Sequence, residues 1–440
     1  MYNKDTVTAK VIGGKNMKKI SLLLVIVLIL SASILLVSCF DDGGVTTSTT
    51  DKQEAKDPSV GLNFTLNDDG ASYSVTGIGD CTDTELIIPE TYEGLPVTTI
   101  GDSAFLACTE LTSVVLPNGI TEILNGAFAY NTSLASIELP ATLKRIEDSA
   151  FIQCTALKSI HVPSGVESIG GHAFFYCTAL ESIKLPASLN SIGEFVFYYC
   201  LSLESIDVDG NNENYKSIDG ALYNKDVTAL LHYPAANPVT KLVLPSTVTS
   251  ITEYSLTENS KLIEIELPEG LASIGEGAFY GCTSLISISI PNGIEEILNG
   301  TFYGCSSLES IELPSTLKRI GEDAFISCTA LKSIDFPDGL KSIGKWSFNG
   351  CTSLESVEIP AGVTTIEQNT FYACTSLKSV VLHDTLSVIG YRAFGDCTSL
   401  ESITYLGSGE QWNYVRCESK WNDNTPVESV VCSNISVPLK

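Results

Sequence analysis

The chain has 440 residues, of which 44% are hydrophobic, and this content is ample for a buried core. Its formal net charge is −27 at pH 7; residues 1–38 hold five Lys and one Asp, so the remainder carries −31. Such a surface repels nucleic acid and anionic lipid headgroups, which excludes nucleic acid as a partner and favours cationic ones.

The first forty residues have the pattern of an export signal. Met17-Lys18-Lys19 is basic, Ile20 to Val37 is apolar, and Leu36-Val37-Ser38-Cys39 resembles the lipobox of bacterial lipoproteins. That resemblance implies a signal peptide over residues 1–38, lipidation of Cys39 and a membrane-anchored lipoprotein at the bacterial cell surface. The competing interpretation is an uncleaved transmembrane anchor, since the run is about the ~20 residues needed to span a bilayer. Residues 1–16 fit no signal pattern, so either Met1 or Met17 is the true start.

Two short segments precede the main part of the chain. Residues 39–59 are polar and lack an apolar period, which predicts a flexible tether. Residues 60–84 hold alternating strand-like residues on both sides of Asp68-Asp69-Gly70, which predicts a hairpin. Because the first turn of a repeat array must be covered, we expect residues 60–84 to form an N-terminal cap.

A 23-residue unit repeats from residue 85 to 404, and Cys305–Ser327 (CSSLESIELPSTLKRIGEDAFIS) is a clean copy. A fixed period of this length is typical of a solenoid. Within the unit, Leu308, Ile311 and Leu313 have the spacing of a half-buried strand that ends at Pro314.

The second half of the unit predicts a turn back into the core. Leu317 and Ile320 return apolar side chains to the interior, and Gly321 is expected to permit a tight bend. Ala324 and Phe325 predict a short helical turn before the next unit begins.

One Phe stands in nearly every unit, 23 residues after the last. The column contains Phe105, Phe128, Phe151, Phe174, Phe197, Phe279, Phe302, Phe325, Phe348, Phe371 and Phe394. This spacing predicts a stacked aromatic spine inside the solenoid. The alternative is a track of aromatic rings for a ligand, which the preceding Ala residues disfavour.

The recurring L-x-S-I-x-L-P with a later I-G-x-x-A-F-x-x-C resembles the BspA-like class of bacterial surface leucine-rich repeats over roughly residues 60–435. The resemblance implies a surface-exposed protein that adheres to host or neighbouring cells. The predicted fold is a β-rich leucine-rich-repeat solenoid with a curved parallel sheet of about fourteen strands, a hairpin cap and a C-terminal cap over residues 405–440. Trp412 and Trp421 are expected to cover the last open turn.

The repeat is interrupted near residues 209–238. Phe197 and Leu256, which hold the Phe place in their units, are 59 residues apart, which is two periods plus 13. We interpret this segment as an expanded unit with an extra hairpin that divides the solenoid into two arrays without cutting the core.

A second column is formed by cysteine: Cys108, Cys154, Cys177, Cys200, Cys282, Cys305, Cys328, Cys351, Cys374 and Cys397. Metal sites need local clusters such as C-x-x-C, and none is present. Asn131 and Asn259 hold the same place and cannot form disulfides, so we predict buried, reduced, structural thiols. Cys417 and Cys432 could bridge in an extracellular setting, and Cys81 has no evident partner.

No catalytic fingerprint accompanies the four His residues, and paired carboxylates recur only because the unit recurs. We therefore expect no enzyme, no cofactor and no metal.

The outward face of the first strand is the best candidate for binding. One outward column is almost uniformly Ser, whereas the other varies. The candidate binding residues of the varied column are Glu138, His161, Lys184, Asp207, Glu266, Glu312, Asp335 and Glu358. The acidic members from Glu266 onward suit a basic protein, although a merely solvated face is the competing interpretation.

A second candidate surface follows the Phe column by one residue, at Phe175, Tyr198, Tyr280, Tyr303 and Tyr372. Exposed rings there could stack on sugars, whereas partial burial is the structural alternative. The leading hypothesis is a lipid-anchored surface protein that binds an extracellular protein, with a carbohydrate-binding module as the alternative.

Overall fold

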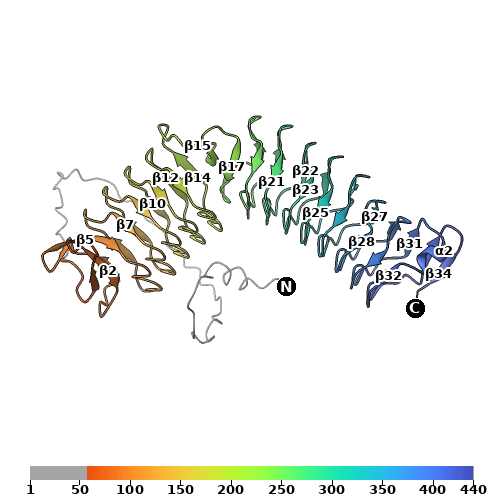
Figure 1. Ribbon diagram of the computed structural model, residues 1–440, viewed down its shortest axis with the longest axis horizontal. Coiled ribbons are helices and arrows are strands. Elements are labelled where there is room, and N and C mark those ends of the chain that lie inside the picture. Colours follow the sequence, from red (N-terminus) through yellow and green to blue (C-terminus); the bar gives the residue numbers. More distant parts are fainter. Residues whose placement is uncertain (1–56, 440) are drawn as a thin grey trace, which may run out of the picture. The chain divides into compact units, whose positions relative to one another are not determined.

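The computed structural model describes residues 57–439, which are almost entirely strands and turns. The predicted signal peptide, Cys39 and most of the tether lie outside this range. Within it, no helix is long and apolar enough to cross a membrane. The turns succeed one another in chain order, as Figure 1 shows for this part of the chain.

Each 23-residue unit forms one turn of a solenoid and contributes two short strands. In the clean copy these are β24 (Ser310–Glu312) and β25 (Arg319–Ile320). Strands of neighbouring turns pair in parallel at an offset of one unit, as Ser287 with Ser310 and Arg319 with Ser342. The predicted β-rich leucine-rich-repeat solenoid is therefore confirmed.

The first strands of the turns form one row of parallel sheets. Its members are β3 (Glu85–Ile87), β6 (Ser113–Val115), β8 (Ser136–Glu138), β10 (Ser159–His161), β12 (Ser182–Leu185), β14 (Ser205–Val208), β18 (Lys241–Val243), β20 (Glu264–Glu266), β22 (Ser287–Ser289), β24, β27 (Ser356–Ile359), β29 (Ser379–Leu382), β31 (Ser402–Tyr405) and β33 (Ser429–Cys432). The antiparallel β34 (Ser436–Pro438) ends this row.

The second strands form another row, which sequence reasoning missed. It contains β5 (Leu95–Ile100), β7 (Glu122–Ile123), β9 (Arg145–Ile146), β11 (Ser168–Ile169), β13 (Ser191–Ile192), β19 (Ser250–Ile251), β21 (Ser273–Ile274), β23 (Glu296–Ile297), β25, β26 (Ser342–Ile343), β28 (Thr365–Ile366), β30 (Val388–Ile389) and β32 (Arg416–Cys417). Most of these strands have two residues, too few for an alternating pattern to be recognised.

The N-terminal end begins with an antiparallel hairpin of β1 (Asn63–Leu66) and β2 (Tyr73–Gly77). Strand β2 then pairs in parallel with β5, so the hairpin continues the second row. The short β4 (Thr91–Tyr92) folds back on β5.

One predicted strand is absent. Ser333, Ile334 and Asp335 have no strand assignment, and the first row breaks there. This unit carries Phe336 where most others carry a smaller aliphatic residue, and its ring packs edge-on against Phe348 at 5.7 Å.

The expected helical turn at Ala324 and Phe325 is wrong. Asp323 and Ser327 have left-handed φ values of 57° and 58°, and the chain makes a tight corner between them. The Phe325 N–H donates to the Ser347 carbonyl of the next turn at 2.7 Å. An α-helix would use such N–H groups within one turn, whereas here they join neighbouring turns.

Gly321 is required for a different reason from the one predicted. Its φ is not left-handed, but an added Cβ would lie 2.7 Å from the backbone nitrogen of Asn299. The glycine therefore permits two turns to approach closely.

The Phe column is a buried spine, as predicted. Its side chains are at most 3% exposed, and the rings of Phe325 and Phe348 stack with centroids 5.0 Å apart and planes 7° apart. Tyr233 and Leu256 are buried and continue the column through the interruption. The Tyr233 N–H donates to the carbonyl of Ser255, the residue before Leu256, just as the Phe325 N–H donates to the carbonyl of Ser347, the residue before Phe348.

The interruption is a three-stranded antiparallel meander of β15 (Tyr215–Ile218), β16 (Ala221–Asn224) and β17 (Ala229–His232). The expectation of an uncut core is wrong. Buried side chains form two large clusters that meet at β16, where Leu222 belongs to one and Ala221 and Tyr223 to the other. Alternate residues of a strand point to opposite faces, so β16 divides the core.

Buried thiols fasten each turn to the one before. Nine cysteines donate S–H to the carbonyl 26 residues earlier, at 3.1–3.2 Å, from Cys154 (to Phe128) to Cys397 (to Phe371). Asn131 replaces the thiol with an amide that donates to the Phe105 and Phe128 carbonyls at 2.9 Å. Cys and Asn share this place because both donate to a buried carbonyl.

The C-terminal end is closed by aromatic side chains. Trp421 lies edge-on to Phe394, the last ring of the spine, with centroids 6.3 Å apart. Trp412 is held by α2 (Gly409–Trp412), whose N-cap Ser408 forms a capping box with Gln411. Cys417 in β32 and Cys432 in β33 belong to different sheets, and both thiols are free.

Candidate binding surface

All eight candidate side chains of the varied column are exposed. Seven of them point outward because their strand alternates around a buried Ile or Val, whereas Asp335 follows the buried Ile334 in the unit that has no strand. Parallel register places neighbours side by side, as in the row His161, Lys184 and Asp207. We call this outward side of the first row the strand face; the binding role of its residues stays a prediction.

The strand face of the first array carries charges of both signs. His161, Lys184 and Asp207 line an open depression of about 450 Å³ together with Ser164 and Asp209. The row combines the cationic Lys184 with the anionic Asp207, so no single sign of potential extends over it.

The strand face of the second array is acidic, but parts of it are neutralised. Lys241 lies 2.9 Å from Glu264 and 2.6 Å from Glu266, and these hydrogen bonds, Glu266 first, raise the pKa of Lys241. Of the candidates, Glu266 therefore has a cationic neighbour. The carboxylates of Glu312, Asp335 and Glu358 have no Lys or Arg within ion-pair distance in the described chain; we call these three the acidic strip.

Sequence reasoning missed the ion pairs that join neighbouring turns. Lys332 and Glu309 lie 2.6 Å apart, and Lys378 and Glu355 lie 2.9 Å apart. The signal was present, because in both pairs the opposite charges are separated by one 23-residue unit. Reading charges at the repeat spacing would have found them.

Exposed apolar side chains lie beside the charges and were also missed. Val243 is 58% exposed, Ile263 42% and Ile286 44%. Val243 is opposite Glu266, and the Ile286 N–H donates to the Ile263 carbonyl at 3.0 Å. At the places of Ile263 and Ile286 most other units carry Lys or Glu, which was the available signal.

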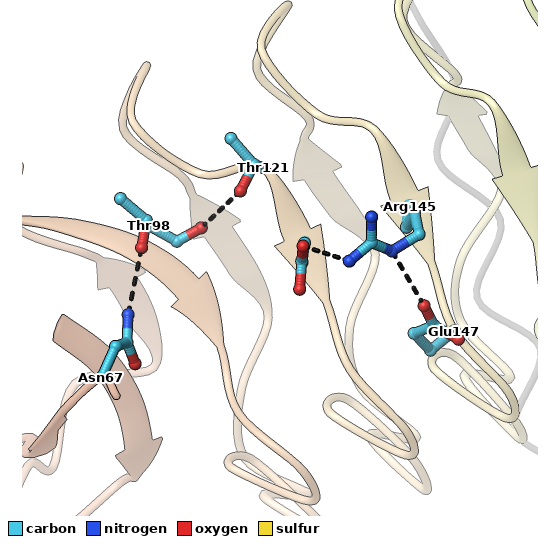
Figure 2. A network of polar contacts seen from close by, with 6 residues as sticks. Asn67, Thr98, Thr121, Arg145 and Glu147 are labelled. Carbon is cyan, nitrogen blue, oxygen red and sulfur yellow. Dashed lines mark hydrogen bonds and ion pairs between the residues drawn. The ribbon is translucent and has the colours of Figure 1, made fainter. Parts of the chain in front are cut away.

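The outward side of the second row is a network of satisfied polar groups. In Figure 2, the Asn67 amide donates to the Thr98 hydroxyl at 3.2 Å, and the Thr121 hydroxyl donates to the Thr98 carbonyl at 3.3 Å. Further along, Arg145 joins Glu122 of the previous turn to Glu147 of its own. These side chains connect neighbouring turns to each other.

The aromatic residues beside the spine are less available than a sugar platform requires. Phe175 and Tyr198 are each 8% exposed, and burial raises the pKa of Tyr280 to about 12. Tyr280 and Tyr303 stack with centroids 4.6 Å apart and planes 7° apart, so their faces cover each other.

Further aromatic residues join this group, and sequence reasoning missed them. His172, Tyr176, Phe195, Tyr199 and Tyr254 occupy left-handed corners with φ between 50° and 62°, where units of the second array use glycine, as at Gly277 and Gly281. The Tyr254 ring contacts Phe195 at 5.8 Å and Tyr198 at 5.1 Å, across the meander. We call these rings, together with Phe175 and Tyr198, the aromatic cover. It connects the two arrays at the place where the core is divided.

The histidines do not form a reactive cluster. Burial lowers the pKa of His232 to about 4, and its ring packs against Phe197 at 5.7 Å. His161 is exposed, and His383 lies 2.6 Å from Asp384. Within residues 57–439, no three His, Cys, Asp or Glu side chains are placed to hold a metal ion.

These features define a leucine-rich-repeat scaffold with one varied, exposed face. The family model for the BspA type leucine rich repeat region matches six copies, over residues 84–226, 234–328 and 295–415, and the chain belongs to this family. Among curated proteins, none matches the chain.

Solved structures share the fold. A leucine-rich repeat protein from Eubacterium ventriosum is 28% identical with a TM-score of 0.60, over 83% of this chain and 93% of that one. A second, from Bacteroides ovatus, is 27% identical with a TM-score of 0.54, over 83% and 98%. The pneumococcal vaccine antigen PcpA is 23% identical with a TM-score of 0.59, over 86% and 98%, which shows the fold alone.

Proposed function

We propose that this protein is a lipid-anchored protein of the bacterial surface that binds a basic extracellular protein through the strand face of its second array. The observation that carries the proposal is the acidic strip of Glu312, Asp335 and Glu358, with the exposed Ile263 and Ile286 immediately before β20 and β22 in the two preceding turns. Carboxylates that lack a cationic neighbour attract a cationic patch, and nearby apolar side chains add contact area.

The first array supports this choice by contrast. Its row of His161, Lys184 and Asp207 has charges of both signs and would steer neither sign of partner strongly. The mature charge of −31 adds a long-range attraction for cations, which salt screens. The proposal assigns no catalysis to the chain.

A triple variant tests the acidic strip. Glu312→Lys, Asp335→Lys and Glu358→Lys together should abolish binding to Arg- and Lys-rich proteins and peptides, measured by surface plasmon resonance at low and high salt. Folding should be unaffected because all three side chains are exposed. A matched control is Glu194→Lys, Glu253→Lys and Glu322→Lys, which makes the same charge change at exposed positions after the second strand.

The two variants separate the alternatives. If the control variant loses binding to the same extent as the triple variant, the effect comes from overall charge. That result would overturn a role for the strand face. A carbohydrate ligand, the alternative hypothesis, would be nearly independent of salt, would survive the triple variant and would be lost on replacing Tyr280 and Tyr303. A glycan array run beside the protein assay decides between them.

The anchor needs its own test. Cys39→Ala should prevent lipidation and leave a precursor with its hydrophobic segment intact, as measured by mass spectrometry of the membrane fraction. Acyl chains on the mature Cys39→Ala protein would contradict the anchor.

A further inference from the structure

Cys81 occupies the cysteine place of the N-terminal cap, although it lies outside the regular repeats. In each regular unit the cysteine follows the spine residue by three positions and its N–H donates to that residue's carbonyl, as Cys154 to Phe151 at 3.1 Å. Cys81 follows Ile78 by three positions and its N–H donates to the Ile78 carbonyl at 3.1 Å. The cap therefore contains the corner of one more turn.

This corner lies against the corner that holds Cys108. The Gly101 N–H donates to the Val75 carbonyl at 2.8 Å, and a Cβ on Gly77 would lie 3.9 Å from the Ala104 carbonyl. Gly77 and Cys81 are separated by the same four positions as Ala104 and Cys108. Corners that stack in this way at about 4.8 Å bring equivalent Cα atoms to within the range of a disulfide, about 4.4–6.8 Å.

Cys81 and Cys108 also differ from the other thiols of the column. The nine cysteines from Cys154 onward are at most 1% exposed and donate to carbonyls. Cys81 and Cys108 are both partly exposed, and within the described chain neither makes a thiol–carbonyl contact of this kind. Burial raises the pKa of the Cys108 thiol, and the nearby Cys81 raises it further.

We propose that Cys81 and Cys108 form a disulfide that fastens the N-terminal cap to the first turn of the solenoid. The oxidant is a small-molecule or protein disulfide. One Cys thiolate attacks it and expels a thiolate; the second Cys thiolate then attacks the mixed disulfide and expels the other. The two protons of the cysteines end on the two thiols released, and the S–S bond of the oxidant is replaced by that of the protein.

Formation of this disulfide in the cell rests on the proposed function in one respect: it requires a location outside the cytoplasm, where such oxidants persist. The chemistry can be tested on purified protein whatever its location or partner. The two proposals can therefore fail separately.

The experiment treats the folded, purified chain with oxidised glutathione and then alkylates it in denaturant without reductant. After proteolysis, mass spectrometry should find one peptide pair joined through Cys81 and Cys108, lighter by two hydrogen atoms than the separate peptides. Cys154 and Cys177, neighbours in the same column but fully buried, are the matched control and should be alkylated. Alkylation of both Cys81 and Cys108, or pairing of either with another cysteine, would overturn the proposal.

Variants give a second readout that does not depend on peptide recovery. Cys81→Ser should raise the number of thiols alkylated after oxidation by one, and Cys108→Ser should do the same, because each frees the partner. Cys154→Ser should lower it by one. In oxidised protein the β1 and β2 amides should exchange about tenfold or more slowly than in reduced protein; equal rates would contradict the fastening of the cap.

Discussion

The two arrays are built from one unit but differ in their surfaces. The segment NGITEILNGAF beginning at Asn118 returns as NGIEEILNGTF at Asn292, and the spines of both arrays stack alike. The strand face, however, changes from mixed charges in the first array to the acidic strip in the second. Residues that recur in every unit build the scaffold. Residues that differ between units are therefore the ones to test for recognition.

The corners differ as well. The first array places bulky rings in left-handed corners, as at Tyr176 and Tyr199, whereas the second uses Gly281 and Gly304 at equivalent places. Left-handed backbone is unfavourable for large side chains, and both arrays bear some of this strain, because the second has Trp346 at φ 60° and Arg392 at φ 51°. What distinguishes the first array is that its corner rings meet Tyr254, whose contacts with Phe195 and Tyr198 join the arrays.

The largest expected effect comes from the spine. Phe325→Ala should cost about 3–5 kcal/mol of unfolding free energy, because the side chain is fully buried. Hydrogen exchange should accelerate mainly in the second array, since β16 divides the core. The matched change Phe128→Ala should act mainly on the first array. A loss below about 1 kcal/mol, or equal effects on both arrays from either variant, would contradict this.

The aromatic cover should have a smaller effect. Tyr254→Ala removes two ring contacts, each worth about 0.5–1.5 kcal/mol, between the arrays. The unfolding transitions of the two arrays, each followed by its own probe, should coincide less well in this variant than in the wild type. The control is Tyr303→Ala, which removes a ring contact within one array; the idea fails if both variants separate the transitions equally.

The smallest expected effect is that of an exposed ion pair. Arg319 lies 2.7 Å from Glu296 and its hydrogen bond lowers the pKa of that carboxyl. A lowered pKa contributes stability above the ordinary value, about 4.3, that is lost as the pH falls through the folded value. Arg319→Gln should therefore cost less than about 1 kcal/mol at neutral pH and nothing at low pH, in denaturation curves at low salt. A loss that persists at low pH would assign Arg319 a packing role.

The sequence predicted those parts of the molecule that repeat with a clear chemical signature. The spine and the first strand follow from the column of Phe and from the alternation around residues such as Ile311. The second row could not be predicted in the same way, because pairs such as Arg319–Ile320 are too short to show a period. The corners were taken for helical turns because Ala324 and Phe325 suit a helix locally, whereas hydrogen bonds to the next turn decide the backbone.

The candidate surface was predicted less well than the core. Outward orientation follows from alternation, but the neutralising contact of Glu266 comes from Lys241, which is 25 residues away and not one 23-residue unit. The aromatic cover depends on Tyr254 reaching across that meander, and no pattern within one unit encodes such a contact.

The constant offset between turns has a consequence for how such a chain changes length. In the regular arrays the contacts between turns recur with the unit: the spine rings stack 23 residues apart, as Phe302 on Phe325, and each of nine column thiols donates to the carbonyl 26 residues earlier, as Cys328 to Phe302. Loss or gain of a whole unit by recombination between similar gene segments leaves each surviving residue facing an equivalent neighbour. The length of the solenoid can therefore change by whole turns between lineages, without any compensating substitution in the core.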